Sequence, residues 1–204
     1  LGDLATGSRW CWPVGRRADD LGVASVDLGA GHLLVLGPPR SGRTTALHSI
    51  AVQARRSDAA TVVVTVDGRD PDRERSAATT RSVLELAAGG GALGEPGVLL
   101  VIDDVCDLLD DDLALDQQLA TVLRRPGRIR VVASAEIDGI GRSFADSPRL
   151  LRIGRRGVLL QPDPDLHPPI LHTSLPRRDD LPAGPGRGWI VGDGPPVAMQ
   201  FALR

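Results

Sequence analysis

The chain has 204 residues, of which 42% are hydrophobic and 25% are charged, and its formal net charge is −2. A chain of this length suits one α/β domain that buries about 70% of the surface exposed by its unfolded state. Acidic and basic residues are mixed along the sequence, so no basic tail indicates nucleic-acid binding. No apolar run approaches the ~20 residues that a membrane-spanning helix needs.

The ends and the cysteines of the chain indicate its origin. The first residue is Leu1 and the only methionine is Met199, which predicts a piece cut from a longer protein. Cys11 and Cys106 stand far apart in the sequence, which favours free thiols over a disulfide and a cytoplasmic location over an oxidising one.

The first two thirds of the chain alternate between predicted strands and helices. Residues 1–22 read as an irregular or edge segment, and residues 23–204 as the domain proper. In chain order, the expected elements are a strand at Val23–Leu28, a strand at Leu33–Leu36, a helix at Thr44–Arg56, a strand at Thr61–Val66, a helix at Ser76–Ala88, a strand at Val98–Ile102, a helix at Leu113–Arg125 and a strand at Ile129–Ala133. This alternation predicts right-handed βαβ units and a mostly parallel central sheet flanked by helices.

The last third of the chain has a different pattern. Short strands are expected at Arg149–Ile153 and Gly157–Gln161, followed by a long surface loop over residues 162–187. Asp193-Gly194 stands between the apolar runs Trp189–Val191 and Val197–Leu203, which is a hairpin signal. We therefore expect a β-hairpin appendage at the C-terminus.

The segment Gly37-Pro38-Pro39-Arg40-Ser41-Gly42-Arg43-Thr44-Thr45 has the spacing of a phosphate-binding P-loop between a buried strand and a helix. Gly37 and Gly42 permit unusual backbone angles, so that N–H groups from Ser41 to Thr45 can cradle phosphate oxygens. The helix N-terminus adds partial positive charge. A plain turn rich in Gly and Pro is the alternative, which the strand, the spacing and the helix together disfavour. The sequence thus predicts a site for a nucleoside triphosphate.

Arg43 stands where a P-loop normally has Lys. A Lys ammonium is a compact charge that reaches the β- and γ-phosphates, whereas the Arg guanidinium is larger and planar. Arg43 can hold a phosphate, but not in the same place. This substitution favours nucleotide binding over fast hydrolysis.

Val98–Ile102 runs directly into Asp103-Asp104, which resembles a Walker B motif. Asp103 is expected to hold Mg²⁺ through water, together with the Thr44 hydroxyl. Asp104 is the candidate catalytic residue, in a position where active relatives usually have Glu. It is one methylene shorter, and a misplacement of about 1 Å can cost about 10²-fold in rate. The alternatives for Asp104 are a solvated turn residue or a helix cap.

Two polar residues follow the next strand. Ser134 stands where a polar side chain can contact the γ-phosphate, although a plain residue at a strand end explains it equally well. Glu136 is a weaker candidate for contact with the attacking water.

Three segments carry a family resemblance. Gly31–Leu47 resembles the P-loop segment of actinobacterial FtsK/SpoIIIE-type ATPase domains, and Asp103–Leu108 resembles the Asp-Glu-Phe-Ala-Asp-Leu stretch of that family. Pro185–Val191 and the final hairpin resemble the end of ATPase domains in the type VII secretion protein EccC and its relatives. The resemblance covers nearly the whole chain from residue 12.

The resemblance implies a RecA-like core with strand order 5-1-4-3-2 and a multidomain, membrane-associated parent that moves DNA or protein. In EccC-like chains the later ATPase domains often have altered motifs, bind nucleotide and serve regulation or substrate recognition. Arg43 and Asp104 place this chain with those later domains. DNA translocases have Thr-Gln-Arg-Pro where Ala133–Glu136 stands here, which counts against a DNA motor.

The resulting prediction is a domain on the cytoplasmic face of the membrane that binds Mg-ATP with slow or absent hydrolysis. Its expected partners are neighbouring ATPase domains of the parent chain and the C-terminal helix of a small secreted WXG100-like protein. The alternatives are an active ATPase motor for protein or DNA translocation and a scaffold with an empty site.

Overall fold

The computed structural model of the chain describes residues 9–58, 60–88, 97–125, 127–163, 170–176 and 184–202. Its strands are β1 (Cys11–Arg17), β2 (Val23–Asp27), β3 (Leu33–Leu36), β4 (Val62–Asp67), β5 (Val98–Asp103), β6 (Ile129–Ala135), β7 (Gly157–Leu160), β8 (Arg187–Val191) and β9 (Val197–Phe201). Its helices are α1 (Arg43–Ser57), α2 (Arg73–Ala88), α3 (Val105–Leu108), α4 (Leu113–Arg124), α5 (Ile137–Arg142) and α6 (Asp146–Ile153), with a 3₁₀ turn at Ile170–His172.

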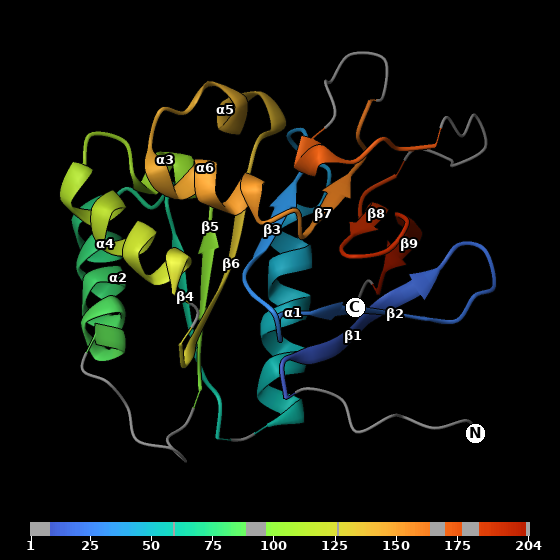
Figure 1. Cartoon of the computed structure of the whole chain (residues 1–204), viewed down its shortest axis with the longest axis horizontal. Coiled ribbons are helices and arrows are strands. Elements are labelled where there is room, and N and C mark those ends of the chain that lie inside the picture. The colour runs from blue at the N-terminus through green and yellow to red at the C-terminus, as the bar shows by residue number, and fades with distance from the viewer. Residues whose placement is uncertain are drawn as a thin grey trace.

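The strands form one mixed sheet in the order β2-β1-β9-β8-β7-β3-β6-β5-β4 (Figure 1). β3 pairs in parallel with β6 and β7, and β5 pairs in parallel with β4 and β6. Numbered in chain order from β3, this parallel group runs 5-1-4-3-2. It is only part of the sheet, since β8, β9, β1 and β2 extend it with antiparallel pairings.

The antiparallel extension corrects two predictions. Residues 11–17 are neither irregular nor an edge, because β1 lies between β2 and β9. Trp12 and Val14 alternate into the core with almost no exposure, while Pro13 and Gly15, where the register shifts, hide the strand signal in the sequence. The C-terminal hairpin is not an appendage either, because β8 pairs with β7 and continues the central sheet. Leu203, the predicted end of the hairpin, lies outside the described residues.

The predicted strand at Arg149–Ile153 is wrong, because this segment belongs to helix α6. The carboxylate of Asp116 on α4 accepts hydrogen bonds of 2.8 Å from the backbone N–H groups of Asp146 and Ser147. Those N–H groups open the helix and have no acceptor within it. β3 lies within the sheet between β6 and β7, so the segment Arg149–Ile153 is not one of its neighbouring strands.

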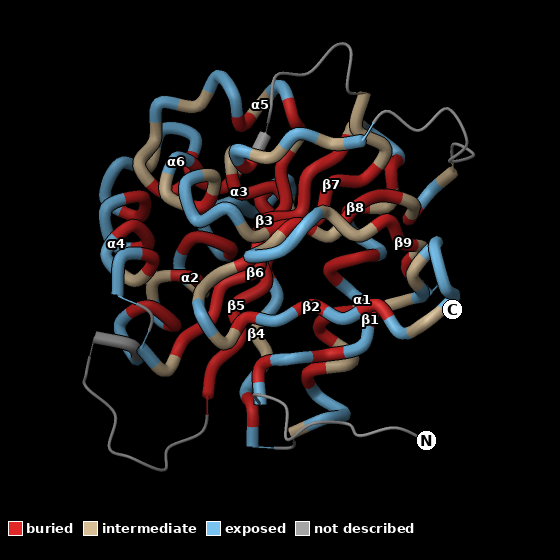
Figure 2. Tube along the Cα trace, turned by 45° about the vertical axis from the view of Figure 1, so that its right-hand side comes forward, coloured by how far each residue is buried: buried red, intermediate tan, exposed pale blue. Residues whose placement is uncertain are grey.

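Each face of the sheet carries its own core. On one face, α1 packs against β3, β5 and β6 through Leu47, Ile50, Ala51 and Ala54, all of them buried. On the other face lie α2, α4 and α6, which Figure 1 shows opposite α1. Figure 2 shows buried residues concentrated along the strands between these layers. Among the described helices, none is long and apolar enough to span a membrane.

Because β3, β4, β5 and β6 run in parallel, their carboxyl ends meet at one edge of the sheet. The parallel register places Asp67 beside Asp103 and Leu36 beside Ala135. The segments that follow these strands are therefore neighbours, which is where open α/β sheets bind ligands.

Candidate functional site

The predicted P-loop connects β3 to α1, and α1 begins at Arg43, directly after Gly42. The first intrahelical bond runs from the Ala46 N–H to the Gly42 carbonyl, and no side chain caps the helix. The backbone N–H groups of residues 43–45 thus lack intrahelical acceptors. They are the donors that an anion at a helix N-terminus uses.

The loop requires glycine at two positions, because other atoms lie too close to its backbone to leave room for a side chain. Gly42 has φ of 98°, and a side chain there would meet the Gly186 nitrogen at 2.9 Å. A side chain at Gly37 would collide with the Ser41 Oγ. The Gly186 N–H donates to the Ser41 carbonyl at 2.8 Å, so the segment before β8 braces the loop. The sequence did not predict this contact between the two segments.

Ser41 is fully buried, and its Oγ has no hydrogen-bond partner among the described residues. Its backbone N–H donates to the Pro38 carbonyl at 3.2 Å, so that group is used within the loop. A buried hydroxyl without a partner is costly. An oxygen-rich ligand in the loop would remove that cost.

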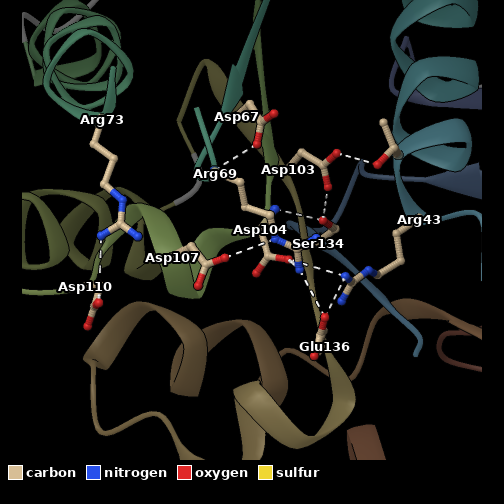
Figure 3. A network of polar contacts seen from close by, with 11 residues as sticks. Arg43, Asp67, Arg69, Arg73, Asp103, Asp104, Asp107, Asp110, Ser134 and Glu136 are labelled. Atoms are coloured by element: carbon tan, nitrogen blue, oxygen red, sulfur yellow. Dashed lines mark hydrogen bonds and ion pairs between the residues drawn. The ribbon is translucent and has the colours of Figure 1, made fainter. Parts of the chain in front are cut away.

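Thr44, Asp103 and Ser134 come from three separate segments and form a short chain of hydrogen bonds. Figure 3 shows Ser134 beside Asp103. The Thr44 hydroxyl donates to Asp103 Oδ2 at 2.6 Å, and the Ser134 hydroxyl donates to Asp103 Oδ1 at 2.5 Å. Ser134 also accepts the Asp104 N–H at 2.9 Å. Since the Ser134 proton is donated to Asp103, Ser134 orients the Asp103 carboxylate in this structure.

Asp104 opens α3 with left-handed backbone angles, φ 59° and ψ 73°, and its side chain does not cap the helix. Its side chain is only 5% exposed, so it is not a solvated turn residue. Asp tolerates the left-handed region better than most residues do. This conformation turns the carboxylate toward Arg43 and Arg69.

Two arginines and three carboxylates form an ion-pair network at the strand ends (Figure 3). Arg43 Nη2 lies 3.4 Å from Asp104 Oδ2 and 3.3 Å from Glu136 Oε1. Arg69 pairs with Asp104 and lies 3.1 Å from Glu136 Oε1 and 3.0 Å from Asp107 Oδ2. The P-loop cation is thus already paired with protein carboxylates.

Burial raises the pKa of Asp104 to about 6, and the guanidinium groups of Arg43 and Arg69 oppose that rise. Asp104 is therefore mainly ionised at pH 7. Both of its neighbouring cations then remain attracted to it.

Most predicted residues gather at this edge. The phosphate-binding candidates all lie in the loop and the first turn of α1: Gly37, Ser41, Gly42, Arg43, Thr44 and Thr45. Arg69 is the residue that sequence reasoning missed. It follows β4, and the only signal for it was the position of Asp67-Gly68-Arg69 at a parallel strand end.

The residues present fit a nucleotide and Mg²⁺. The free N–H groups and the Ser41 hydroxyl suit phosphate oxygens, and the Thr44 hydroxyl with the Asp103 carboxylate supplies the oxygen donors that Mg²⁺ prefers. A pocket of about 340 Å³ opens beside Thr44 and Asp103. Within the described residues, no group of three or more His, Cys, Asp or Glu would hold a metal alone. A metal here would rely on water and phosphate as well.

No protein-family model matches the chain, and no curated protein matches it. Solved structures share its fold. The cytoplasmic domain of EssC has a TM-score of 0.76 at 17% identity, covering 97% of this chain and 44% of that one. The cytoplasmic domain of the Thermomonospora curvata type VII secretion ATPase EccC has 0.74 at 15% identity, covering 100% and 27%. T. curvata EccC (ATPases 2 and 3) in complex with a signal sequence peptide has 0.73 at 17% identity, covering 100% and 42%.

This chain therefore spans less than half the length of each of these proteins. At identities below 20%, the similarity concerns the fold. The chain has the fold of the cytoplasmic ATPase domains of EssC and EccC.

Proposed function

We propose that this domain binds Mg-ATP, hydrolyses it slowly or not at all, and serves a regulatory or substrate-recognition role in a type VII secretion ATPase of the EccC kind. The binding half of the proposal rests on the P-loop. Uncapped N–H groups head α1, and Thr44 and Asp103 lie 2.6 Å apart beside them. Neither feature depends on the residue at position 43.

The slow-hydrolysis half rests on one observation, the ion pairing of Asp104. Hydrolysis needs a carboxylate with a free lone pair that orients water and a cation on the γ-phosphate. Asp104 Oδ2 is buried and contacts both Arg43 and Arg69. Arg43 also pairs with Asp104 and Glu136, so these carboxylates would compete with a phosphate for its guanidinium. The network therefore engages both groups that hydrolysis needs, the carboxylate that would orient water and the cation that would contact the γ-phosphate.

Calorimetry with Mg-ATP and single-turnover hydrolysis test this proposal. We expect saturable Mg-ATP binding by the wild-type domain and turnover far below the ~10 s⁻¹ typical of enzymes. The pair Arg43→Lys and Asp104→Glu should raise turnover if the deficit is local. Wild-type hydrolysis of several ATP per second would instead support the alternative, an active motor.

The partner proposal starts from the T. curvata EccC structure that contains a signal sequence peptide. In this chain, a groove of about 500 Å³ lies between α2, α4 and the start of β6, with Leu84, Val122 and Ile129 in its lining. An amphipathic helix from a small secreted protein would bury its apolar face in such a groove. Titration of C-terminal peptides from such proteins checks it, and absence of binding removes it.

Location and neighbours follow from the same comparison. Two of the similar structures are cytoplasmic domains, and another contains ATPases 2 and 3 of its protein. We infer that this domain works on the cytoplasmic face of a membrane, beside other ATPase domains of a longer chain. Co-purification of the full parent with membranes, and release by detergent, checks this placement.

A further inference from the structure

Two arginine nitrogens and two carboxylate oxygens form a closed ring at the strand ends. Asp104 Oδ2 and Glu136 Oε1 are each contacted by Nη2 of Arg43 and by Nη2 of Arg69. The two arginines therefore share the same acceptors. Whatever weakens one arginine's contact leaves the acceptors more available to the other.

The sharing of acceptors matters most for Arg43, because this residue occupies the cation position of the P-loop. Its side chain is 7% exposed, and its Nη1 has no hydrogen-bond partner among the described residues. A third phosphate would compete for this guanidinium with the Glu136 and Asp104 oxygens, because both of them already contact its Nη2. ADP has no third phosphate, so backbone N–H groups can bind it without that competition.

We propose that Glu136 and Arg69 are positioning residues that set, in opposite directions, the preference of this site for ATP over ADP. The proposal rests on the nucleotide binding proposed above. Glu136 holds Arg43 and so disfavours its pairing with the γ-phosphate. Arg69 engages the same carboxylates, weakens their hold on Arg43 and so favours ATP.

Asp107 supplies a matched control for charge. It contacts Arg69 at 3.0 Å, whereas Glu136 contacts both Arg69 and Arg43. Asp107→Asn and Glu136→Gln change the net charge equally, so any long-range effect on a nucleotide is similar. Only Glu136→Gln removes a direct competitor for Arg43.

The experiment measures dissociation constants for Mg-ATP and Mg-ADP by calorimetry on the wild type and these variants. Glu136→Gln should tighten ATP binding about three- to tenfold, as expected for a partly exposed ion pair with a buried partner, and change ADP binding less than about twofold. Arg69→Gln should weaken ATP binding by a similar factor. Arg69→Lys should fall between Arg69→Gln and the wild type. Asp107→Asn should alter the ATP-to-ADP ratio less than about twofold.

Three results would overturn the inference while leaving nucleotide binding intact. They are equal changes for ATP and ADP, a shift in the same direction for Glu136→Gln and Arg69→Gln, and an Asp107→Asn effect as large as that of Glu136→Gln. Absence of any nucleotide binding by the folded wild type would overturn the proposed function and this inference together. Circular dichroism confirms that each variant is folded.

Discussion

At the scale of single residues, Thr44 is the most informative side chain of the site. Its hydroxyl lies 2.6 Å from Asp103 Oδ2, and Asp103 is fixed from the other side by Ser134. Thr44→Ala should weaken Mg-ATP binding about tenfold, because it removes one charge-assisted hydrogen bond and one oxygen donor for Mg²⁺. Calorimetry measures the loss.

The control for Thr44 is the metal itself. In EDTA, wild type and Thr44→Ala should bind ATP with nearly equal affinity, because the hydroxyl then has no cation to bind. An equal loss with and without Mg²⁺ would contradict the metal role and indicate that Thr44 only supports the loop.

At the scale of elements, α6 depends on a side chain from another helix. Asp116 is buried on α4 and accepts from the N–H groups of Asp146 and Ser147, while the Ser147 hydroxyl donates to its carbonyl at 3.0 Å. Asp116→Ala leaves two N–H groups without a partner at a buried helix end. We expect a loss of about 3 kcal/mol in the free energy of unfolding, measured by urea denaturation.

Gln117 offers the comparison, since it is the next residue on α4 and is exposed. Gln117→Ala should change the free energy of unfolding by less than about 0.5 kcal/mol. Equal effects of Asp116→Ala and Gln117→Ala would show that the contact between α4 and α6 does not stabilise the fold.

At the scale of the whole molecule, two buried groups should make stability depend on pH in opposite ways. Burial, helped by Arg130, lowers the pKa of His32 to about 4, and the His32 Nδ1 accepts the Val131 N–H at 3.0 Å. Between pH 4 and 6.5 the unfolded state therefore binds the extra proton, and stability rises with pH. Asp104, with a pKa raised to about 6, binds its proton in the folded state, so its contribution falls with rising pH between 4 and 6.

The two slopes, each at most about 1.4 kcal/mol per pH unit, should nearly cancel in the wild type. In His32→Gln only the contribution of Asp104 to the pH dependence remains. The free energy of unfolding of this variant should therefore rise relative to wild type as pH falls from 6 to 4. Asp104→Asn should lose stability over the same window. Urea denaturation at several pH values measures both, and parallel curves for all three proteins would contradict the assignment.

The sequence by itself determined the features whose signals are local. Apolar runs and helical spacing predicted the strands from β3 to β6 and the helices α1, α2 and α4, but not the short helix α3. The spacing Gly37 to Thr44 predicted a loop between a strand and a helix, which is where the structure has it. The pattern failed at α6, because a short apolar segment fits a strand or a helix equally well. Asp116, whose carboxylate accepts from the first N–H group of α6, lies thirty residues earlier in the chain.

Only the tertiary structure decided which side chains of the site form ion pairs with one another. Arg43 and Glu136 are separated by 93 positions, and Arg69 and Glu136 by 67. The spacing of residues within a single strand or helix cannot predict such contacts, because parallel strands bring their carboxyl ends together regardless of distance along the chain. Arg43 and Asp104 could be recognised in the sequence as departures from the motifs. That they pair with each other, and that Arg69 and Glu136 belong to the same ion-pair network, follows from the order of the strands in the sheet.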